Sequence, residues 1–307
     1  MAVSICDVHT NTNEQEVTGH GRREFPIAIY EDDMRVVPVP LHWHEEYEYI
    51  LATKGLVTVN LGTQQVELKE GEAVFINSGC LHGVKSISSG ESVLRSLVIL
   101  PRLIGGSTDS IFWSRLVAPL SGKTAPAWIF LDGREKWQQE IREQMLLAWE
   151  VIREEDFDYE NEARFRVSRA IRLLLDNLPQ IEVQGKRNDS VVNRMKPILA
   201  YMEAHYMEDI SNQLLMELGG CSESVLLRNF RQVTGTSPLQ YLLDYRMQKA
   251  AEMLLTTEIK SADIAMACGF RDVSYFTKTF RRKMGSTPIE YRKSKEEGHR
   301  LISRDDV

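Results

Sequence analysis

Short apolar runs separated by glycine turns fill residues 25–131. Regularly spaced runs of this kind are typical of antiparallel strands that close into a barrel or stack as a sandwich. The pattern therefore predicts an all-β domain over residues 21–131. The runs are Glu48–Leu51, Leu56–Leu61, Val66–Leu68, Ala73–Ile76 and Val93–Leu100, with turns at Lys54-Gly55, Gly62-Thr63 and Glu70-Gly71.

From residue 135 the apolar spacing changes to the period of a helix. Trp137, Ile141 and Met145 recur at steps of four, and a second helical stripe runs from Val167 to Leu178. The pattern predicts two amphipathic helices on either side of the acidic turn Glu154-Glu155-Asp156. Their stripes can pack on the preceding β domain or form a dimer surface, and periodicity favours neither use. We treat residues 132–180 as a helical dimerisation segment.

The C-terminal region matches itself at an offset of 50 residues. A repeat of this length indicates that one supersecondary unit occurs twice. Eight positions agree, namely Gly219/Gly269, Leu226/Phe276, Arg228/Lys278, Phe230/Phe280, Arg231/Arg281, Gly235/Gly285, Pro238/Pro288 and Tyr241/Tyr291.

Each copy has the pattern of a short helix, a tight turn and a second helix. In the first copy Gly219-Gly220 ends a helix and Ser222 can cap the next one, because glycine accepts the left-handed conformation and a serine hydroxyl accepts from a helical N–H. In the second copy Gly269 and Asp272 take these places. Both copies therefore predict a helix-turn-helix. Residues 239–255 predict a connecting helix of about 25 Å.

The second helix of each copy separates apolar and cationic faces. Two residues correspond to about 200° around a helix, so stripes displaced by two positions lie on opposite sides. A helix anchored by aromatic residues that turns hydroxyl and cationic groups outward can enter a major groove. The apolar stripes are Leu226, Phe230 and Val233, then Phe276 and Phe280; the polar stripes are Ser224, Arg228 and Arg231, then Ser274, Lys278 and Arg281.

The net charge of -7 divides unevenly along the chain. Residues 1–190 hold 20 Lys+Arg and 29 Asp+Glu, which gives -9, and residues 191–307 hold 17 and 15, which gives +2. Arg271–Lys283 contains five basic residues and one acidic residue. Because phosphate contact depends on local basic clusters, an acidic chain remains compatible with DNA binding.

Length and cysteine usage restrict the class of protein. A chain of 307 residues can form two or three domains. Cys6, Cys80, Cys221 and Cys268 are scattered without a C-x-x-C pair, which argues against a disulfide framework or zinc ribbon and fits a reducing cytosol. No apolar stretch approaches the ~18 residues of a membrane helix, and we see no secretory signal. We expect a cytoplasmic protein with no membrane partner.

Two runs in the C-terminal region carry a family signature. GFRDVSYFTKTF is followed by GSTPIEYR, and the first copy reads GGCSESVLLRNFRQVTGTSPLQY. Together with YMEAHY at 201–206, they resemble the AraC/XylS family of bacterial regulators over about residues 191–294. The resemblance implies seven helices in two helix-turn-helix subdomains joined by a long helix.

The matching positions imply which side chains contact DNA. Two positions depart from the family: Leu227 is apolar where a polar residue is common, which leaves contact with a thymine methyl or no base contact, and Ser261 replaces a usually apolar residue. The implied base-reaching residues are Ser224, Leu227 and Arg228, then Val273, Ser274, Tyr275 and Lys278, and the implied phosphate contacts are Arg231, Arg281 and Arg282.

The β domain carries His42-Trp43-His44 and Glu48 in the pattern H-x-H-x-x-x-E, and residues 71–82 read G-x5-N-x-G-x2-H, ending at His82. These runs resemble the two motifs of the cupin barrel, although Asn77 replaces the usual proline and the trailing asparagine is missing. In metal cupins these positions bind Mn, Fe, Ni or Zn, ions that suit three imidazoles and a carboxylate.

Two interpretations of His42, His44, Glu48 and His82 stay open. They are polar groups of a small-molecule effector pocket, or ligands of a divalent transition metal. The prediction assigns no obligatory cofactor.

The sequence thus predicts an α+β chain. An N-terminal antiparallel cupin-like β-barrel with trailing helices precedes a C-terminal all-α domain with two helix-turn-helix units. A loose tail (1–20), a linker (181–190) and a charged tail (295–307) complete it. The resemblance implies a non-enzymatic, ligand-responsive transcription regulator that forms a homodimer on double-stranded DNA, with RNA polymerase considered as an additional partner. A metal-dependent cupin enzyme, an oxygenase or isomerase with a helical accessory domain, is the alternative.

Overall fold

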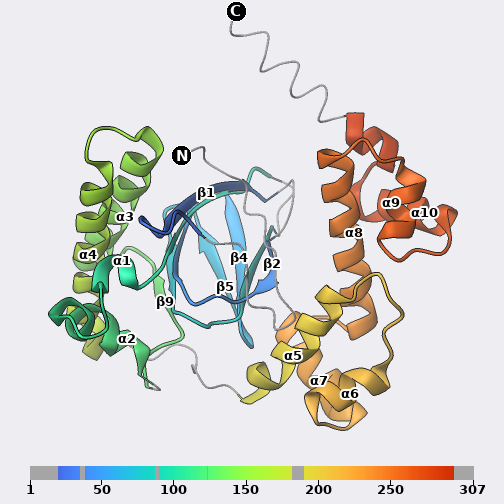
Figure 1. Ribbon diagram of the computed structural model, residues 1–307, viewed down its shortest axis with the longest axis horizontal. Coiled ribbons are helices and arrows are strands. Elements are labelled where there is room, and N and C mark those ends of the chain that lie inside the picture. Colours follow the sequence, from blue (N-terminus) through green and yellow to red (C-terminus); the bar gives the residue numbers. More distant parts are fainter. Residues whose placement is uncertain (1–19, 35–38, 87–89, 123, 182–189, 294–307) are drawn as a thin grey trace, which may run out of the picture. The chain divides into compact units, whose positions relative to one another are not determined.

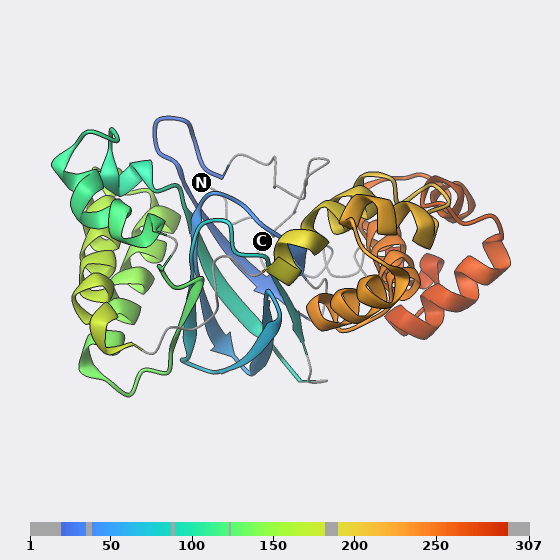
Figure 2. The same cartoon turned by 90° about the horizontal axis from the view of Figure 1, so that it is seen from below.

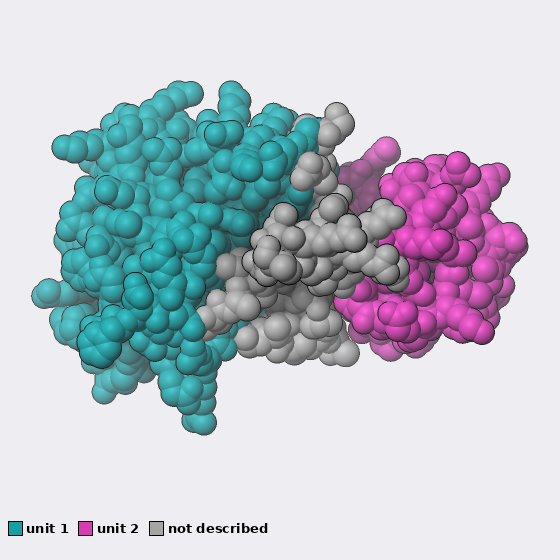
Figure 3. Space-filling model, turned by 90° about the horizontal axis from the view of Figure 1, so that it is seen from above, with its two compact units in different colours: residues 1–196 teal, residues 197–307 magenta. Residues whose placement is uncertain are grey.

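The computed structural model describes residues 20–34, 39–86, 90–122, 124–181 and 190–293. The chain forms two compact units (Figure 3), an N-terminal unit of residues 1–196 and a C-terminal unit of residues 197–307. The boundary falls within helix α5 (Ser190–Ala204), at Pro197. The predicted linker and both predicted tails lie largely or wholly outside the described residues.

Two antiparallel sheets form the centre of the N-terminal unit (Figure 1). One has the strand order β1-β8-β3-β6-β9 and the other β2-β7-β4-β5, and within the described ranges no ladder joins the two sheets into a closed barrel. The strands are β1 (Ile27–Asp33), β2 (Val39–His42), β3 (Tyr47–Lys54), β4 (Leu56–Leu61), β5 (Gln64–Lys69), β6 (Ala73–Ile76), β7 (His82–Ser86), β8 (Val93–Ile99) and β9 (Trp128–Leu131).

The predicted β domain is confirmed, and its three glycine turns connect β3 to β4, β4 to β5 and β5 to β6. The apolar runs identify β3, β4, β5, β6 and β8. The sequence did not single out β1, β2, β7 or β9. Of these, β1, β2 and β9 are edge strands, and β7 lies between β2 and β4.

Two long helices cover the five-stranded sheet. In Figures 1 and 2, α3 (Lys136–Glu154) and α4 (Tyr159–Asn177) lie side by side. Ile141, Trp149 and Val167 are buried in one core with side chains of β1, β3, β6, β8 and β9, and the Trp149 indole N–H donates to the Tyr30 carbonyl at 3.2 Å. The predicted stripes therefore pack on the chain's own sheet. Shorter helical segments are α1 (Arg102–Gly105), η1 (Trp113–Val117), α2 (Ala118–Ser121) and η2 (Leu178–Gln180).

The C-terminal unit repeats one arrangement of helices. Helices α7 and α10 have equal lengths of 12 residues, begin 50 positions apart and end at glycines in the left-handed conformation. Counting the helical residues 288–293, the described part of this region holds the seven helices that the family implies. Besides α5 they are α6 (Asn212–Gly219), α7 (Glu223–Thr234), α8 (Pro238–Thr256), α9 (Ser261–Ala267) and α10 (Val273–Met284).

The two helix-turn-helix units also share their core. Phe230 packs edge-on against Tyr241 with ring centroids 5.6 Å apart, and Phe280 packs against Tyr291 at 5.4 Å. Burial of the two phenylalanines confirms the predicted apolar stripes.

The caps differ between the copies. The Asp272 carboxylate accepts from the N–H groups of Ser274 and Tyr275 at 2.7 and 3.0 Å. Ser222 occupies the cap position of α7 without a side-chain capping hydrogen bond, and its hydroxyl lies 3.3 Å from that of Ser224. The predicted cap is thus correct in the second copy, and in the first copy it is correct in position only.

No helix found in the described ranges combines the length and apolarity that crossing a membrane requires.

Candidate nucleic-acid interface and candidate metal centre

The predicted DNA-contacting side chains all lie on the solvent side of the two recognition helices. Burial of Leu226 and Phe230 in one copy, and of Phe276 and Phe280 in the other, fixes the rotation of each helix. The opposite face is therefore exposed. The exposed residues are Ser224, Leu227, Arg228 and Arg231 on α7, and Val273, Ser274, Tyr275, Lys278, Arg281 and Arg282 on α10.

A hollow of about 460 Å³ runs along the exposed face of α10. It brings Ser274, Lys278 and Arg281 together with Thr277 and Thr287. Hydroxyl and cationic groups of this kind bind phosphate oxygens and base edges. Sequence reasoning missed the two threonines. The spacing of Thr277 from Val273, one helical turn, was the available signal for the first, whereas Thr287 lies beyond the end of α10.

The two recognition helices carry different charge. Helix α10 holds Lys278, Arg281, Arg282 and Lys283 and no acidic residue, whereas α7 holds Arg228, Arg231 and the acidic Glu223. Electrostatic attraction to a phosphate backbone, which is independent of sequence, is therefore stronger at α10.

The N-terminal unit brings the four predicted cupin residues together between its sheets. His42 ends β2 and pairs in register with His82 at the start of β7, while Glu48 lies on β3 of the other sheet. One nitrogen or oxygen atom from each of His42, His44, Glu48 and His82 lies within 4.8 Å of those of the others. All four residues are buried, with exposed fractions of 3%, 3%, 6% and 1%.

Backbone carbonyls orient the three imidazoles. The Nδ1 atoms of His42, His44 and His82 lie 3.0, 3.2 and 2.9 Å from the carbonyl oxygens of Pro40, Glu46 and Cys80. Because a carbonyl only accepts, each Nδ1 carries a hydrogen and the Nε2 atoms face the centre of the cluster. This is the outer hydrogen bonding that metal-ligating histidines use.

The Glu48 carboxylate contacts two of the three imidazoles. Its Oε2 atom lies 2.7 Å from His82 Nε2 and 3.4 Å from His44 Nε2. Burial alone would raise the pKa of Glu48, but hydrogen bonds from His44 and His82 outweigh it and hold this pKa well below its usual range. Burial, together with the nearby His82 and His44, holds the pKa of His42 well below its usual value, which keeps this imidazole neutral and able to coordinate a metal.

The donor set fits a divalent transition metal. The buried Nε2 atom of His44 makes a long contact of 3.4 Å with Glu48 Oε2, and three imidazole nitrogens with one carboxylate oxygen match the preferences of Zn, Ni, Fe and Mn. An ion at this place would replace the direct contact between His82 Nε2 and the Glu48 carboxylate.

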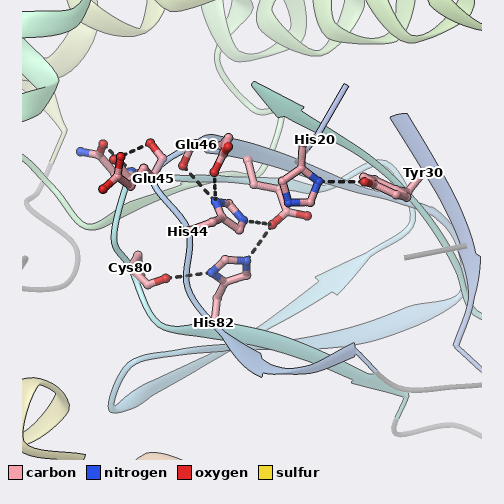
Figure 4. A network of polar contacts seen from close by, with 10 residues as sticks. His20, Tyr30, His44, Glu45, Glu46, Cys80 and His82 are labelled. Carbon is pink, nitrogen blue, oxygen red and sulfur yellow. Dashed lines mark hydrogen bonds and ion pairs between the residues drawn. The ribbon is translucent and has the colours of Figure 1, made fainter. Parts of the chain in front are cut away.

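His20 is a further member of the site that the sequence did not reveal. It ends the predicted loose tail (1–20), yet it is buried. Its Nδ1 lies 2.8 Å from the Tyr30 hydroxyl, and its ring centroid lies 5.5 Å from that of His44 (Figure 4). No local motif marks His20, because its place depends on the path of the chain into β1.

Asn77 explains one departure from the cupin pattern. Its side-chain amide donates to the carbonyls of Leu120 and Pro126, both at 2.9 Å, and its backbone N–H donates to the Ala127 carbonyl at 2.9 Å. These bonds tie the loop that leads to His82 to the segment before β9. A proline at this position would lose all three.

Comparison with known proteins finds the same two-part organisation. Residues 26–154 match the model of the AraC-like ligand binding domain, and residues 216–294 match that of a helix-turn-helix domain. The HTH-type transcriptional regulator YdeC of Bacillus subtilis is 28% identical over 92% of this chain and 96% of its own length. The HTH-type transcriptional activator RhaS of Escherichia coli is 30% identical over 48% of this chain and 53% of its own length.

Among solved structures, ToxT of Vibrio cholerae is similar with a TM-score of 0.44 and 14% identity, over 88% of this chain and 98% of that one.

These sequence relatives are transcriptional regulators and not enzymes, which leaves the cupin-enzyme alternative without support. The ligand-binding model matches the N-terminal unit, and the helix-turn-helix model matches the C-terminal unit. The chain therefore belongs to the AraC/XylS family of ligand-responsive, DNA-binding transcription regulators.

Proposed function

We propose that the N-terminal unit binds a small effector or metal ion at the His42, His44, Glu48 and His82 cluster, and that this binding biases how α7 and α10 enter adjacent major grooves. The observation that carries the proposal is the duplicated recognition helix, which has the same length, end and buried stripe in both copies. Ligand control requires that the effector bind two arrangements of the protein with different affinity.

The dimensions of the C-terminal unit support binding of both helices to one face of a duplex. Helix α8 contains 19 residues, which correspond to about 28 Å. One turn of B-DNA is about 34 Å. A spacer of this length is compatible with two recognition helices in successive major grooves.

Substitution of the central cation of each recognition helix tests the DNA-binding proposal. Arg228→Ala and Lys278→Ala should each weaken binding to a mapped operator about 5- to 150-fold, because one good base contact contributes about 1–3 kcal/mol of discrimination. Circular dichroism should show unchanged helix content. The matched control is Lys54→Ala with Arg134→Ala, which removes two exposed cations from the N-terminal unit. Unchanged operator affinity in both single variants would contradict the proposed faces.

We propose that the buried cluster can hold a divalent transition metal. The Nε2 atoms of His42, His44 and His82 and a carboxylate oxygen of Glu48 would be its ligands. The ion would supply a Lewis-acidic position for an effector oxygen or nitrogen.

The test is metal analysis after incubation with Mn, Fe, Ni or Zn salts. Wild-type protein should retain one ion per chain, and His44→Ala should lose it. His205→Ala removes a partly exposed histidine of the C-terminal unit and should leave the metal content unchanged. Equal metal content in wild type and His44→Ala would exclude this site.

We further propose that the regulator is a homodimer through the outer side of α3 and α4. A groove of about 880 Å³ there exposes Leu147 and Phe165 between acidic and basic side chains such as Glu140 and Arg169, a mixture that suits a symmetric contact. Leu147→Glu with Phe165→Glu should produce monomers in sedimentation velocity. Phe157→Glu, at the exposed turn between these helices, should not. A double variant that keeps the wild-type mass would contradict this interface.

We also propose that the protein resides in the cytoplasm and, for a role as an activator, that it contacts RNA polymerase.

A further inference from the structure

The two recognition helices differ in chemistry at their first residue. Glu223 begins α7 and Val273 begins α10, and the two positions are 50 residues apart, as the repeat requires. Both side chains are exposed. Val273 matches a base-reaching position of the family, so the repeat puts Glu223 at the same place in the first copy. Glu223 is thus a further candidate DNA contact on α7, beyond those that the family pattern implies.

A second difference accompanies the first. The Asn212 side-chain amide, at the start of α6, donates to Glu223 Oε1 at 3.1 Å. The position that matches Asn212 in the second copy is Ala262, in α9. The first copy therefore has an amide and a carboxylate joined across its turn, whereas the second copy has two apolar side chains. Asn212 restrains the carboxylate and leaves its second oxygen available to another donor.

A carboxylate on a DNA-facing helix has few favourable partners. Phosphate groups repel it, and the base edges in the major groove are largely acceptors apart from the exocyclic amino groups of cytosine and adenine. The cytosine N4 amino group is the donor that Glu and Asp side chains usually read. At the matching place in the second copy, Val273 can contact only an apolar group such as the thymine methyl.

The charges of the two helices agree with a division of roles. Helix α10 has four cationic residues and no acidic one, so it can hold the duplex regardless of sequence. In α7 the Glu223 carboxylate offsets one of two cations, which weakens the attraction of this helix to any phosphate backbone. Discrimination between bases is then its larger contribution to DNA binding.

We infer that Glu223, positioned by Asn212, selects a cytosine in the part of the operator that α7 contacts. This inference rests on the proposed DNA-binding function and adds a base preference to it. Removal of the carboxylate has two consequences: cytosine loses its advantage at one position, and affinity for unrelated DNA rises because a phosphate-repelling charge is lost.

The experiment is selection of duplexes from a randomised library by the full chain, followed by sequencing. Wild type should retain a two-part motif with cytosine at one position of one part. In Glu223→Gln that position should change to adenine, which glutamine pairs with through two hydrogen bonds. In Glu223→Val it should change to thymine, and cytosine discrimination should fall about 5- to 150-fold in both variants. Asn212→Ala should keep cytosine with reduced discrimination.

The control is Glu217→Gln, which removes an equivalent exposed charge from α6 and should retain the wild-type motif. If Glu223→Gln and Glu223→Val select the wild-type base with wild-type strength, Glu223 is not a specificity residue and the inference is wrong. The inference is also wrong if these variants lose selection at every position while their helix content is intact. Glu223 would then affect the binding of α7 in general and not the choice of one base. If wild type selects no motif, the proposed function itself fails.

Discussion

The turn of the second helix-turn-helix can be tested with two glycines that share a backbone conformation but not their surroundings. Gly269 follows α9 with φ +79°, and an added Cβ there would lie 2.7 Å from the carbonyl oxygen and 2.9 Å from the Cα of Met207. Gly285 ends α10 with φ +77°, and an added Cβ there would have no neighbour within 4 Å. The added methyl group therefore meets a steric conflict in Gly269→Ala and none in Gly285→Ala.

The structure sets the size of the two effects. A left-handed alanine costs about 1–2 kcal/mol, and this is the whole expected loss for Gly285→Ala. At Gly269 the new methyl group also pushes against main-chain atoms of Met207 that no side-chain rotation can move, and overpacking of this kind costs about a further 1–3 kcal/mol. Gly269→Ala should thus lower the stability of the C-terminal unit by about 2–5 kcal/mol.

The tryptophans make the assay specific for one unit. All five precede residue 150, from Trp43 to Trp149, so tryptophan fluorescence follows only the N-terminal unit, whereas far-ultraviolet circular dichroism follows helices of both. In urea, Gly269→Ala should move the helical transition of the C-terminal unit to lower concentration than Gly285→Ala does, and the fluorescence transition should stay in place. Equal shifts of the helical transition in the two variants would refute the steric argument. A shift of the fluorescence transition would show that the substitution also destabilises the N-terminal unit.

Three further results are expected. Arg231→Ala and Arg281→Ala should each reduce the slope of log affinity against log salt by about 0.9, one phosphate contact; an unchanged slope would remove that residue from the backbone contacts. Asn77→Pro should destabilise the N-terminal unit in the fluorescence assay by about 3 kcal/mol, because three hydrogen bonds of about 1 kcal/mol each are lost; wild-type stability would show that these bonds contribute little. Burial raises the pKa of the Cys268 thiol to about 11, so alkylation of native Cys6→Ser protein should label Cys221 well before Cys268, and equal labelling rates by mass spectrometry would contradict this burial.

Elements with a strong local signal could be predicted from the sequence. Glycine turns and apolar runs gave β4 and β6 with their observed bounds, and the 50-residue repeat anticipated the matched helices α7 and α10. Strand β7 (His82–Ser86) was not predicted, because its residues include a histidine, a glycine and a lysine and show no apolar alternation. Strand β9 is short and pairs with β6, more than fifty residues earlier. Such pairing depends on tertiary contacts that a local pattern does not carry.

The buried histidine cluster was likewise predicted in part. Motif spacing identified His42, His44, Glu48 and His82, and the fold brings all four together. It did not identify His20, which is buried in contact with Tyr30 and His44. Sequence placed Ser222 correctly at the start of α7 but did not foresee that its capping bond is missing. Sequence can therefore propose a ligand set, but groups that arrive from elsewhere in the chain need coordinates.

Helix α8 has one consequence for how such a regulator can diverge. Its N-terminal end packs against the first helix-turn-helix through Tyr241, and its C-terminal half is buried with the second through Met247, Ala250 and Leu254. Deletion of a single residue from it would rotate one unit relative to the other by about 100°. Exchanges on α7 or α10 can alter which bases are preferred one at a time. The distance between the two preferred base clusters is tied to this rotation, because both depend on the length of α8. Spacing should therefore persist among descendants after base preference has drifted.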